Sequence, residues 1–99
     1  MNTSMFVVVA QFELQPGSRE EFVAALLANR KQTVTTEHGC RMYEICIPED
    51  SETGIVLLEM YDDRAAFDLH HATPHWKAWY DAANHLIVSN NVRFMSRRL

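Results

Sequence analysis

The chain has 99 residues and a formal net charge of −4, with 47% hydrophobic and 22% charged residues. This length and composition predict one ordinary globular domain spanning residues 1–99. The negative charge argues against nucleic-acid binding, which requires a basic face to offset phosphate charges. No apolar run approaches the ~18 residues of a membrane span, and residues 1–12 carry neither the basic segment nor the cleavage site of a signal peptide. We therefore expect no membrane partner and a cytoplasmic location.

Two cysteines, Cys40 and Cys46, lie on a segment with the composition of a single strand. At roughly 3.3 Å per residue, they are too far apart along a strand to form a disulfide with each other. We expect two reduced cysteines that pack as small side chains, which agrees with a cytoplasmic location.

Residues 5–14, MFVVVAQFEL, form the first predicted strand, because they are rich in residues that favour β-structure. The run from Phe6 to Ala10 is apolar at successive positions, whereas a strand that is wet on one face alternates polar and apolar residues. Both faces of the sheet are therefore expected to be covered, one by helices and the other by a second subunit. Pro16 and Gly17 end the strand with a turn.

The first helix is predicted to begin at Ser18. Ser18-Arg19-Glu20-Glu21 has the form of a capping box, with serine at the N-cap and Glu21 three residues later. Asn29 falls on the apolar stripe, so it faces inward and needs a hydrogen-bond partner, either within the protein or on a ligand. Gly39 is expected to close the helix in the left-handed conformation. The stripe consists of side chains at three- and four-residue steps: Phe22, Val23, Leu26, Leu27, Arg30 and Val34.

Two further strands are predicted at residues 41–47 and 55–61, joined by the polar loop 48–54. Period-two alternation puts Glu59 and Tyr61 on the same face of the second of these strands. A carboxylate among apolar neighbours has two interpretations. It is either an edge-strand or interface group paired with an arginine, or a group that orients a histidine or accepts a proton.

Residues 61–80 contain both tryptophans and three of the five histidines. Asp63 is predicted to cap one short helix, and Thr73, which precedes a proline, to cap a second helix at residues 74–84. Because the residue before a proline avoids the α-helical conformation, Thr73 separates the two helices. Residues 86–95 then form a fourth strand.

The histidines of this stretch raise the question of a metal site. His71 and His75 are four residues apart, a spacing that puts two imidazoles on one face of a continuous helix and can hold zinc. Pro74 interrupts that face, so the sequence predicts no metal centre. His70 ends the first helix and His75 begins the second, and we expect both to point toward the space beneath the helix junction. Histidine is the side chain that titrates near neutral pH.

The predicted elements form two β-α-β halves divided near residue 50. This order is the split βαβ, or ferredoxin-like, arrangement with an antiparallel sheet, which is an α+β fold. Helices cover one face of the sheet, and the apolar second face predicts a homodimer that packs sheet against sheet.

The stretch LLEMYDDRAAFDLHHATPHWKAW resembles the signature of the antibiotic biosynthesis monooxygenase superfamily. That signature is an apolar strand with Glu-x-Tyr/Trp, an acidic helix start, Ala-x-x-x-His, and Thr/Ser-Pro-His followed by an aromatic residue. The Pro-Gly end of the first strand, the Glu-rich start of the first helix and the turn at residues 37–41 match as well, so the resemblance spans nearly the whole chain. The matching positions are Glu59, Tyr61, Asp63, Ala66, His70, Thr73, Pro74, His75 and Trp76.

The resemblance implies a dimeric ferredoxin-like α/β barrel. Members of the superfamily include cofactor-independent monooxygenases of quinols and polycyclic aromatics, haem-degrading enzymes, and an enzyme that processes a phosphorylated autoinducer. Two of these branches, the quinol monooxygenases and the autoinducer enzyme, look most similar to this chain. The Asn, Trp and His set of the haem branch is not matched, because residues 5–14 contain no asparagine.

The predicted chemistry needs no cofactor, since the sequence has no metal motif, no Gly-rich dinucleotide loop and no flavin signature. A base removes a proton from a quinol-like small molecule, and the resulting anion passes an electron to O2. His70 or His75 is the candidate base, and Glu59 is a further catalytic candidate. Asn29 and Tyr61 are expected to hydrogen-bond the substrate. The remaining substrate-binding candidates form apolar walls: Phe22, Leu26, Tyr43, Trp76 and Trp79.

Two other classes of function remain open on the sequence alone. The first is an isomerase or degrading enzyme for a phosphorylated, autoinducer-like carbonyl compound, which shares the proton abstraction but not the oxygen step. A phosphate-holding cluster of Arg30, Lys31 and Arg41 would favour it. The second is a dimeric module that binds a small molecule without catalysis.

Overall fold

The computed structural model describes residues 4–98. The predicted order of elements is confirmed, including the division of the second helical segment at Thr73. Within residues 4–98, no helix combines the length and apolarity needed to cross a membrane. Residues 1–3, part of the segment considered above for a signal peptide, lie outside the described residues. The elements are β1 (Phe6–Leu14), α1 (Arg19–Thr36), β2 (Cys40–Cys46), β3 (Gly54–Tyr61), α2 (Arg64–His71), α3 (Pro74–Ala83), a 3-10 turn (Asn84–Leu86) and β4 (Ile87–Ser96).

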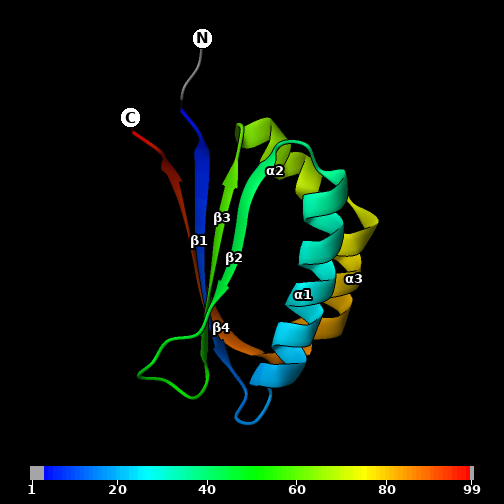
Figure 1. Cartoon of the computed structure of the whole chain (residues 1–99). Coiled ribbons are helices and arrows are strands. Elements are labelled where there is room, and N and C mark those ends of the chain that lie inside the picture. The colour runs from blue at the N-terminus through cyan, green and yellow to red at the C-terminus, as the bar shows by residue number, and fades with distance from the viewer. Residues whose placement is uncertain (1–3, 99) are drawn as a thin grey trace.

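The four strands form one antiparallel sheet in the order β2-β3-β1-β4. This order confirms the ferredoxin-like split βαβ arrangement, because β3 lies between the two strands that α1 connects. Figure 1 shows all three helices on the same side of the sheet. In the register of the central strands, Val8 lies opposite Glu59 on one side and Phe94 on the other.

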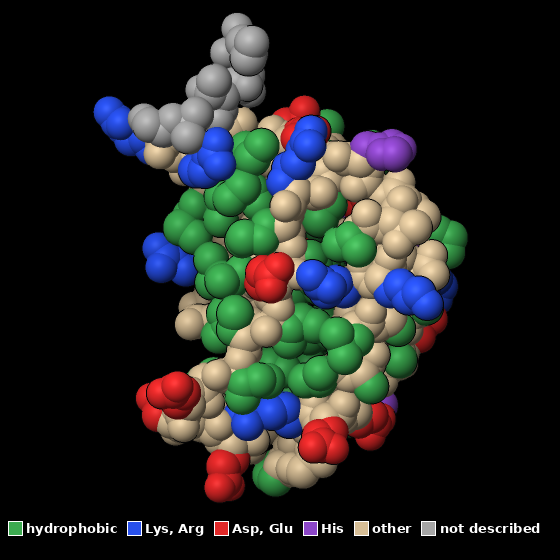
Figure 2. All heavy atoms as spheres, in the orientation of Figure 1, with side chains coloured by type: hydrophobic (Ala, Val, Ile, Leu, Met, Phe, Trp, Pro, Cys, Tyr) green, Lys and Arg blue, Asp and Glu red, His purple; other side chains and the backbone are tan. Residues whose placement is uncertain are grey.

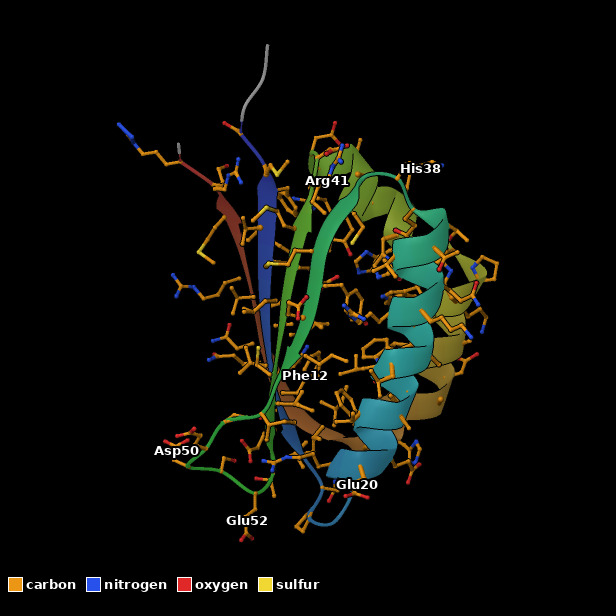
Figure 3. The ribbon with its side chains drawn as sticks, in the orientation of Figure 1. Phe12, Glu20, His38, Arg41, Asp50 and Glu52 are labelled. Atoms are coloured by element: carbon orange, nitrogen blue, oxygen red, sulfur yellow. The ribbon has the colours of Figure 1, made fainter. Side chains whose placement is uncertain are left out.

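The core lies between the sheet and the helices. Alternate residues of β1 are buried on this side, among them Val8, Ala10 and Phe12, as period-two geometry requires. Figure 3 shows Phe12 pointing from β1 into the space between the sheet and the helices. Its ring centroid lies 5.2 Å from that of Phe22 on α1, so this pair ties the sheet to the helix.

The opposite face of the sheet carries no helix. The intervening positions on β3 and on the first half of β1 are apolar and only half-buried, for example Val9 and Leu58, which pair on adjacent strands, whereas Gln11 and Glu13 on β1 are polar and exposed. On the edge strand β4, Met95 pairs with Val7 and adds an exposed apolar side chain to this face. Figure 2 shows hydrophobic side chains gathered over the strand side of the molecule. The apolar second face expected from the sequence is therefore present, and the dimer remains a prediction.

The helix caps agree with the sequence in two of three cases. Asp63 accepts a hydrogen bond from the Ala66 amide at 2.9 Å, and Thr73 accepts one from the Trp76 amide at 3.2 Å. The predicted capping box at Ser18 is wrong, although α1 does begin directly after this residue. The Ser18 hydroxyl instead donates to the Gln15 carbonyl at 2.6 Å, because the turn between them brings that oxygen within reach.

Gly39 has a different role from the one expected. Its φ is not positive; among residues 4–98 the glycine with a left-handed backbone is Gly17, at φ 81°. Gly39 is required by a close approach instead, since a Cβ at this position would lie 2.7 Å from the Ala66 Cβ. The turn after α1 can therefore pack directly on α2.

Gly39→Ala is expected to lower the free energy of unfolding by about 1–3 kcal/mol, the usual cost of overpacking. Urea denaturation measures the change. In an Ala66→Gly background, where the opposing methyl group is absent, the same substitution should cost clearly less. An equal cost in both backgrounds would show that the contact with Ala66 is not the reason for the glycine.

Candidate functional site

A cavity of about 230 Å³ lies between the sheet and the helices. An apolar cavity of about 150 Å³ is sufficient to bind benzene, so this one has room for a somewhat larger ring system. Most of its wall is apolar or aromatic, with a few polar side chains, as is typical of small-molecule sites. The residues that line it are Val8, Ala10, Phe12, Leu26, Asn29, Tyr43, Leu57, Glu59, Phe67, His70, His71, Trp76, Trp79, Tyr80, Asn84, Ile87, Asn90 and Val92.

Most of the candidates named from the sequence lie on this wall. Three do not. Phe22 is fully buried and packs between Phe12 and Trp79. Tyr61 is also fully buried, beneath Glu59, and His75 lies behind His70. The candidates that line the cavity are Leu26, Asn29, Tyr43, Glu59, His70, Trp76 and Trp79.

His70 and His71 both line the cavity, and His70 is the buried one of the two, at only 3% exposed. Its Nδ1 lies 2.8 Å from Oε2 of Glu37. An ionised carboxylate only accepts hydrogen bonds, so we assign the ring proton to Nδ1, which leaves Nε2 with a free lone pair. Burial lowers the pKa of His70, and the hydrogen bond to Glu37 opposes this shift. The neutral imidazole is therefore favoured, and its Nε2 is available to accept a proton.

Glu37 is the functional residue that the sequence argument missed. It follows directly after α1, and Figure 1 shows this end of α1 beside α2 and the start of α3. Its Oε2 contacts both Nδ1 of His70 and Nε2 of His75. The signal was present in the turn at residues 37–41, which matched the family pattern, but no spacing rule connects Glu37 to histidines more than 30 positions away.

His75 stands at the start of α3 and contacts Glu37 rather than the cavity. Its ring centroid lies 5.7 Å from that of His70. His71 also lines the cavity but does not contact Glu37: its Nδ1 is 3.2 Å from the Phe67 carbonyl, and its ring lies against Trp76. The break between α2 and α3 thus separates His71 from His75, as expected. It also brings His75 next to His70 through their shared contact with Glu37.

Glu59 lies on the central strand β3 and is 6% exposed. The interpretation as an edge-strand carboxylate paired with an arginine is wrong. Its Oε1 accepts a hydrogen bond from the Tyr61 hydroxyl and lies 4.0 Å from Nε2 of His70. Burial raises the pKa of Glu59 to about 7; the Tyr61 hydrogen bond lowers it and the charge of Glu37 raises it. This carboxyl group can therefore exchange a proton near neutral pH.

Asn29 holds together α1, β2 and α3. Its Nδ2 donates to the His75 carbonyl at 3.1 Å, and its Oδ1 accepts from the Tyr43 hydroxyl at 3.0 Å and from the Thr33 hydroxyl at 3.2 Å. Burial raises the pKa of Tyr43, which keeps this hydroxyl protonated as a donor. The polar partner that the helix stripe required is therefore found within the protein.

Trp79 carries an unused hydrogen-bond donor. Its Nε1 is buried and has no partner in the described part of the chain, although Trp79 lines the cavity. Buried tryptophan N–H groups normally have an acceptor. Because Nε1 itself is not exposed to the cavity, a ligand oxygen can accept from it only after the indole ring moves. Nearby, Trp76 and Tyr80 stack with ring centroids 5.4 Å apart and extend the aromatic wall.

The basic residues do not form a phosphate site. Arg30 donates to the Tyr43 carbonyl at 2.7 Å. Arg41, which is labelled in Figure 3, pairs with Asp62 at 2.6 Å. Within residues 4–98, neither lysine nor arginine lines the cavity.

Comparison with known proteins finds relatives of one family over most of the chain. The sequence profile of the antibiotic biosynthesis monooxygenase family matches residues 5–82. The protein YgiN of Escherichia coli, named a probable quinol monooxygenase, is 26% identical over 100 residues, which cover 92% of this chain and 96% of YgiN.

Two further relatives extend the comparison to solved structures. The Mycobacterium tuberculosis protein Rv0793, whose name gives monooxygenase as a provisional activity, is 37% identical over 75 residues, covering 75% of this chain and 71% of Rv0793. Its solved structure superposes with a TM-score of 0.80 over 96% of this chain and 94% of that one, at 28% identity. A Caulobacter crescentus structure, assigned provisionally to the same family, has a TM-score of 0.92 at 24% identity, covering 97% of this chain and 92% of that one; it shows the shared fold. The chain therefore belongs to the antibiotic biosynthesis monooxygenase family.

Proposed function

We propose that this protein is a cofactor-independent monooxygenase that oxidises a small quinol-like aromatic with O2, and that His70 is its base. One observation carries the proposal. His70 lies on the wall of an aromatic cavity, with Nδ1 held by a carboxylate and Nε2 free to accept a proton. A histidine oriented by a carboxylate is a common arrangement for a general base. The name of YgiN supports the choice of a quinol as the substrate class.

The proposed reaction begins with transfer of a quinol O–H proton to Nε2 of His70. The electron-rich anion passes one electron to O2, and the resulting radical pair joins to form a C–O bond at a ring carbon. The protonated His70 returns its proton to the resulting peroxide, and the hydroperoxide then loses water and leaves a carbonyl group. A quinol with a ring C–H plus O2 thus gives a hydroxyquinone plus H2O, so that one oxygen atom enters the product and the other leaves as water.

The remaining cavity residues have supporting roles in this scheme. Nε1 of Trp79 donates to a substrate oxygen and stabilises its developing negative charge. Glu59, 4.0 Å from Nε2 of His70, accepts or returns a proton between steps. The aromatic walls exclude water, which favours electron transfer from an anion that has lost its hydration shell.

Oxygen dependence tests the proposal directly. With 1,4-dihydroxynaphthalene as the quinol, we expect enzyme-dependent O2 consumption and incorporation of one 18O atom from labelled O2 into the product. Full-rate product formation without O2 would exclude a monooxygenase and favour an isomerase. Saturable ligand binding with no turnover of any quinol would favour a binding module. No lysine or arginine lines the described cavity wall. This speaks against the alternative function, an isomerase or degrading enzyme for a phosphorylated, autoinducer-like compound.

Glu37→Gln is expected to lower kcat about 10–100-fold with little change in KM, because the amide no longer fixes the His70 tautomer with Nε2 free. Steady-state kinetics on 1,4-dihydroxynaphthalene measure the change, and Glu37→Asp should recover part of the rate. Glu44→Gln, which removes an exposed carboxylate on β2, is the matched control. A loss confined to KM would show that Glu37 acts on binding rather than on the base.

We also propose that the protein forms a homodimer through the helix-free face of its sheet. Support comes from the apolar, half-covered side chains on that face, such as Val9 and Leu58. A small domain often gains stability in this way. Light scattering at micromolar concentration should give twice the chain mass of 11.4 kDa, and Val9→Lys should shift the mass toward the monomer. A stable wild-type monomer would refute this assembly.

A further inference from the structure

We infer that Glu37, His70 and His75 form a binding site for one divalent transition-metal ion of the zinc type. The site lies behind the proposed base, on the side of His70 away from the cavity, since neither Glu37 nor His75 lines that cavity. Its ligand atoms are Oε2 of Glu37, Nδ1 of His70 and Nε2 of His75. In this role the ion switches the base off rather than supplying the chemistry.

The geometry of the three ligand atoms carries the inference. They all lie within 4.8 Å of one another. Ligand atoms bound to one tetrahedral zinc lie about 3.3 Å apart, because each bond is about 2.0–2.2 Å long. Small side-chain movements therefore bring all three atoms onto one ion. Two imidazoles and one carboxylate are also a ligand set that suits zinc and its neighbours better than magnesium or calcium.

The surroundings of the cluster match a metal site in a second respect. A histidine that binds a metal through one nitrogen usually donates its other N–H to a carboxylate, a backbone carbonyl or a water molecule. For His70, Glu59 is the carboxylate nearest to that N–H: its Oε1 lies 4.0 Å from Nε2, which is longer than a hydrogen bond but can be closed by a small side-chain movement. Oε1 of Glu37 is buried without a hydrogen-bond partner among the described residues, so one oxygen of the proposed ligand is still unsatisfied.

The ligands are also held in place, and the ion has a route to them. The Asn29 side chain fixes the start of α3 through the His75 carbonyl, and the Thr73 hydroxyl donates to the His70 carbonyl at 2.7 Å. The side chains of Glu37 and His75 remain 12% and 13% exposed, which opens the cluster toward solvent. A preorganised site with an entry path is what reversible metal binding requires.

Binding changes the tautomer of His70 without net release of a proton. When Nδ1 gives its lone pair to the ion, its proton must move to Nε2, and the proton of His75 moves likewise from Nε2 to Nδ1. Nε2 of His70 then donates toward Glu59 and can no longer accept a substrate proton. The inhibition that follows rests on the proposed function, whereas the binding itself does not.

Calorimetric titration of metal-free protein with Zn²⁺ tests the site. We expect one ion per chain and at least a tenfold weaker affinity in both Glu37→Gln and His75→Ala. His71→Ala and His85→Ala remove a neighbouring and a distant histidine and should change the affinity less than twofold. Mg²⁺ should give no binding at equal concentration. Two independent ligand variants keep the test valid if one of them fails to fold by circular dichroism.

A spectroscopic measurement decides between this cluster and the cysteines. Co²⁺ in the proposed site should show ligand-field bands without thiolate-to-metal charge transfer. A charge-transfer band that disappears in Cys40→Ser or Cys46→Ser, or Zn²⁺ affinity unchanged in both ligand variants, would overturn the inference. Zn²⁺ should also stop quinol-dependent O2 consumption. If the protein oxidises no quinol at all, binding, stoichiometry and the cobalt spectrum still test the site.

Discussion

His70→Ala is expected to reduce kcat/KM for quinol oxidation by roughly 10²–10⁴-fold, the usual contribution of a positioned general base. The reason is geometric, because His70 is the histidine on the cavity wall whose Nε2 is free while Nδ1 is bound to Glu37. Oxygen-electrode kinetics with 1,4-dihydroxynaphthalene measure the loss. We expect kcat to fall more than KM rises, since the aromatic walls that hold the ring remain.

His85→Ala is the control for this experiment. His85 is exposed, and its ring lies near Glu21 at the far end of α1. Its removal should leave turnover unchanged. Full activity of His70→Ala would remove His70 from the mechanism. If His75→Ala lost all activity instead, His75, which contacts the same Glu37 oxygen, would be the base.

Glu59→Gln is expected to stabilise the protein increasingly as the pH rises from 4.5 to about 7. The pKa of Glu59 is raised from its ordinary value of 4.5 to about 7, chiefly by burial. A carboxyl group with a raised pKa in the folded state favours folding while it is protonated. That contribution is complete below pH 4.5 and is lost as the pH rises through 7. Glutamine cannot ionise, so it avoids a cost that reaches about 3 kcal/mol above pH 7.

Urea denaturation of both proteins between pH 4 and pH 8 measures this difference. The comparison with wild type isolates the effect of Glu59, and the amide oxygen of glutamine can still accept the Tyr61 hydroxyl. Glu44→Gln, on the adjacent strand, removes an exposed carboxylate and should change stability by about 1 kcal/mol or less. A stability difference between Glu59→Gln and wild type that does not vary with pH would mean that Glu59 does not carry the raised pKa.

Local signals in the sequence were sufficient to derive the fold. Alternation in residues 55–61 correctly placed Glu59 and Tyr61 on one buried face, because side chains on a strand alternate strictly. The caps at Asp63 and Thr73 were also predictable from local sequence, because each side chain accepts a hydrogen bond from an amide only three residues away. The Ser18 cap failed because a competing acceptor, the Gln15 carbonyl, lies in a turn whose geometry the residue pattern does not specify.

The sequence by itself determined the elements of this protein, their order and its family. It also named His70, His75 and Glu59, because histidines and carboxylates at unusual positions are visible in a single chain. Only the tertiary structure decided how they work together. Glu37 joins His70 to His75 across more than 30 residues, and such contacts arise where helix ends meet in space. Spacing rules describe neighbours on one element, so they excluded the His71–His75 pair and could not reveal the cluster that replaced it.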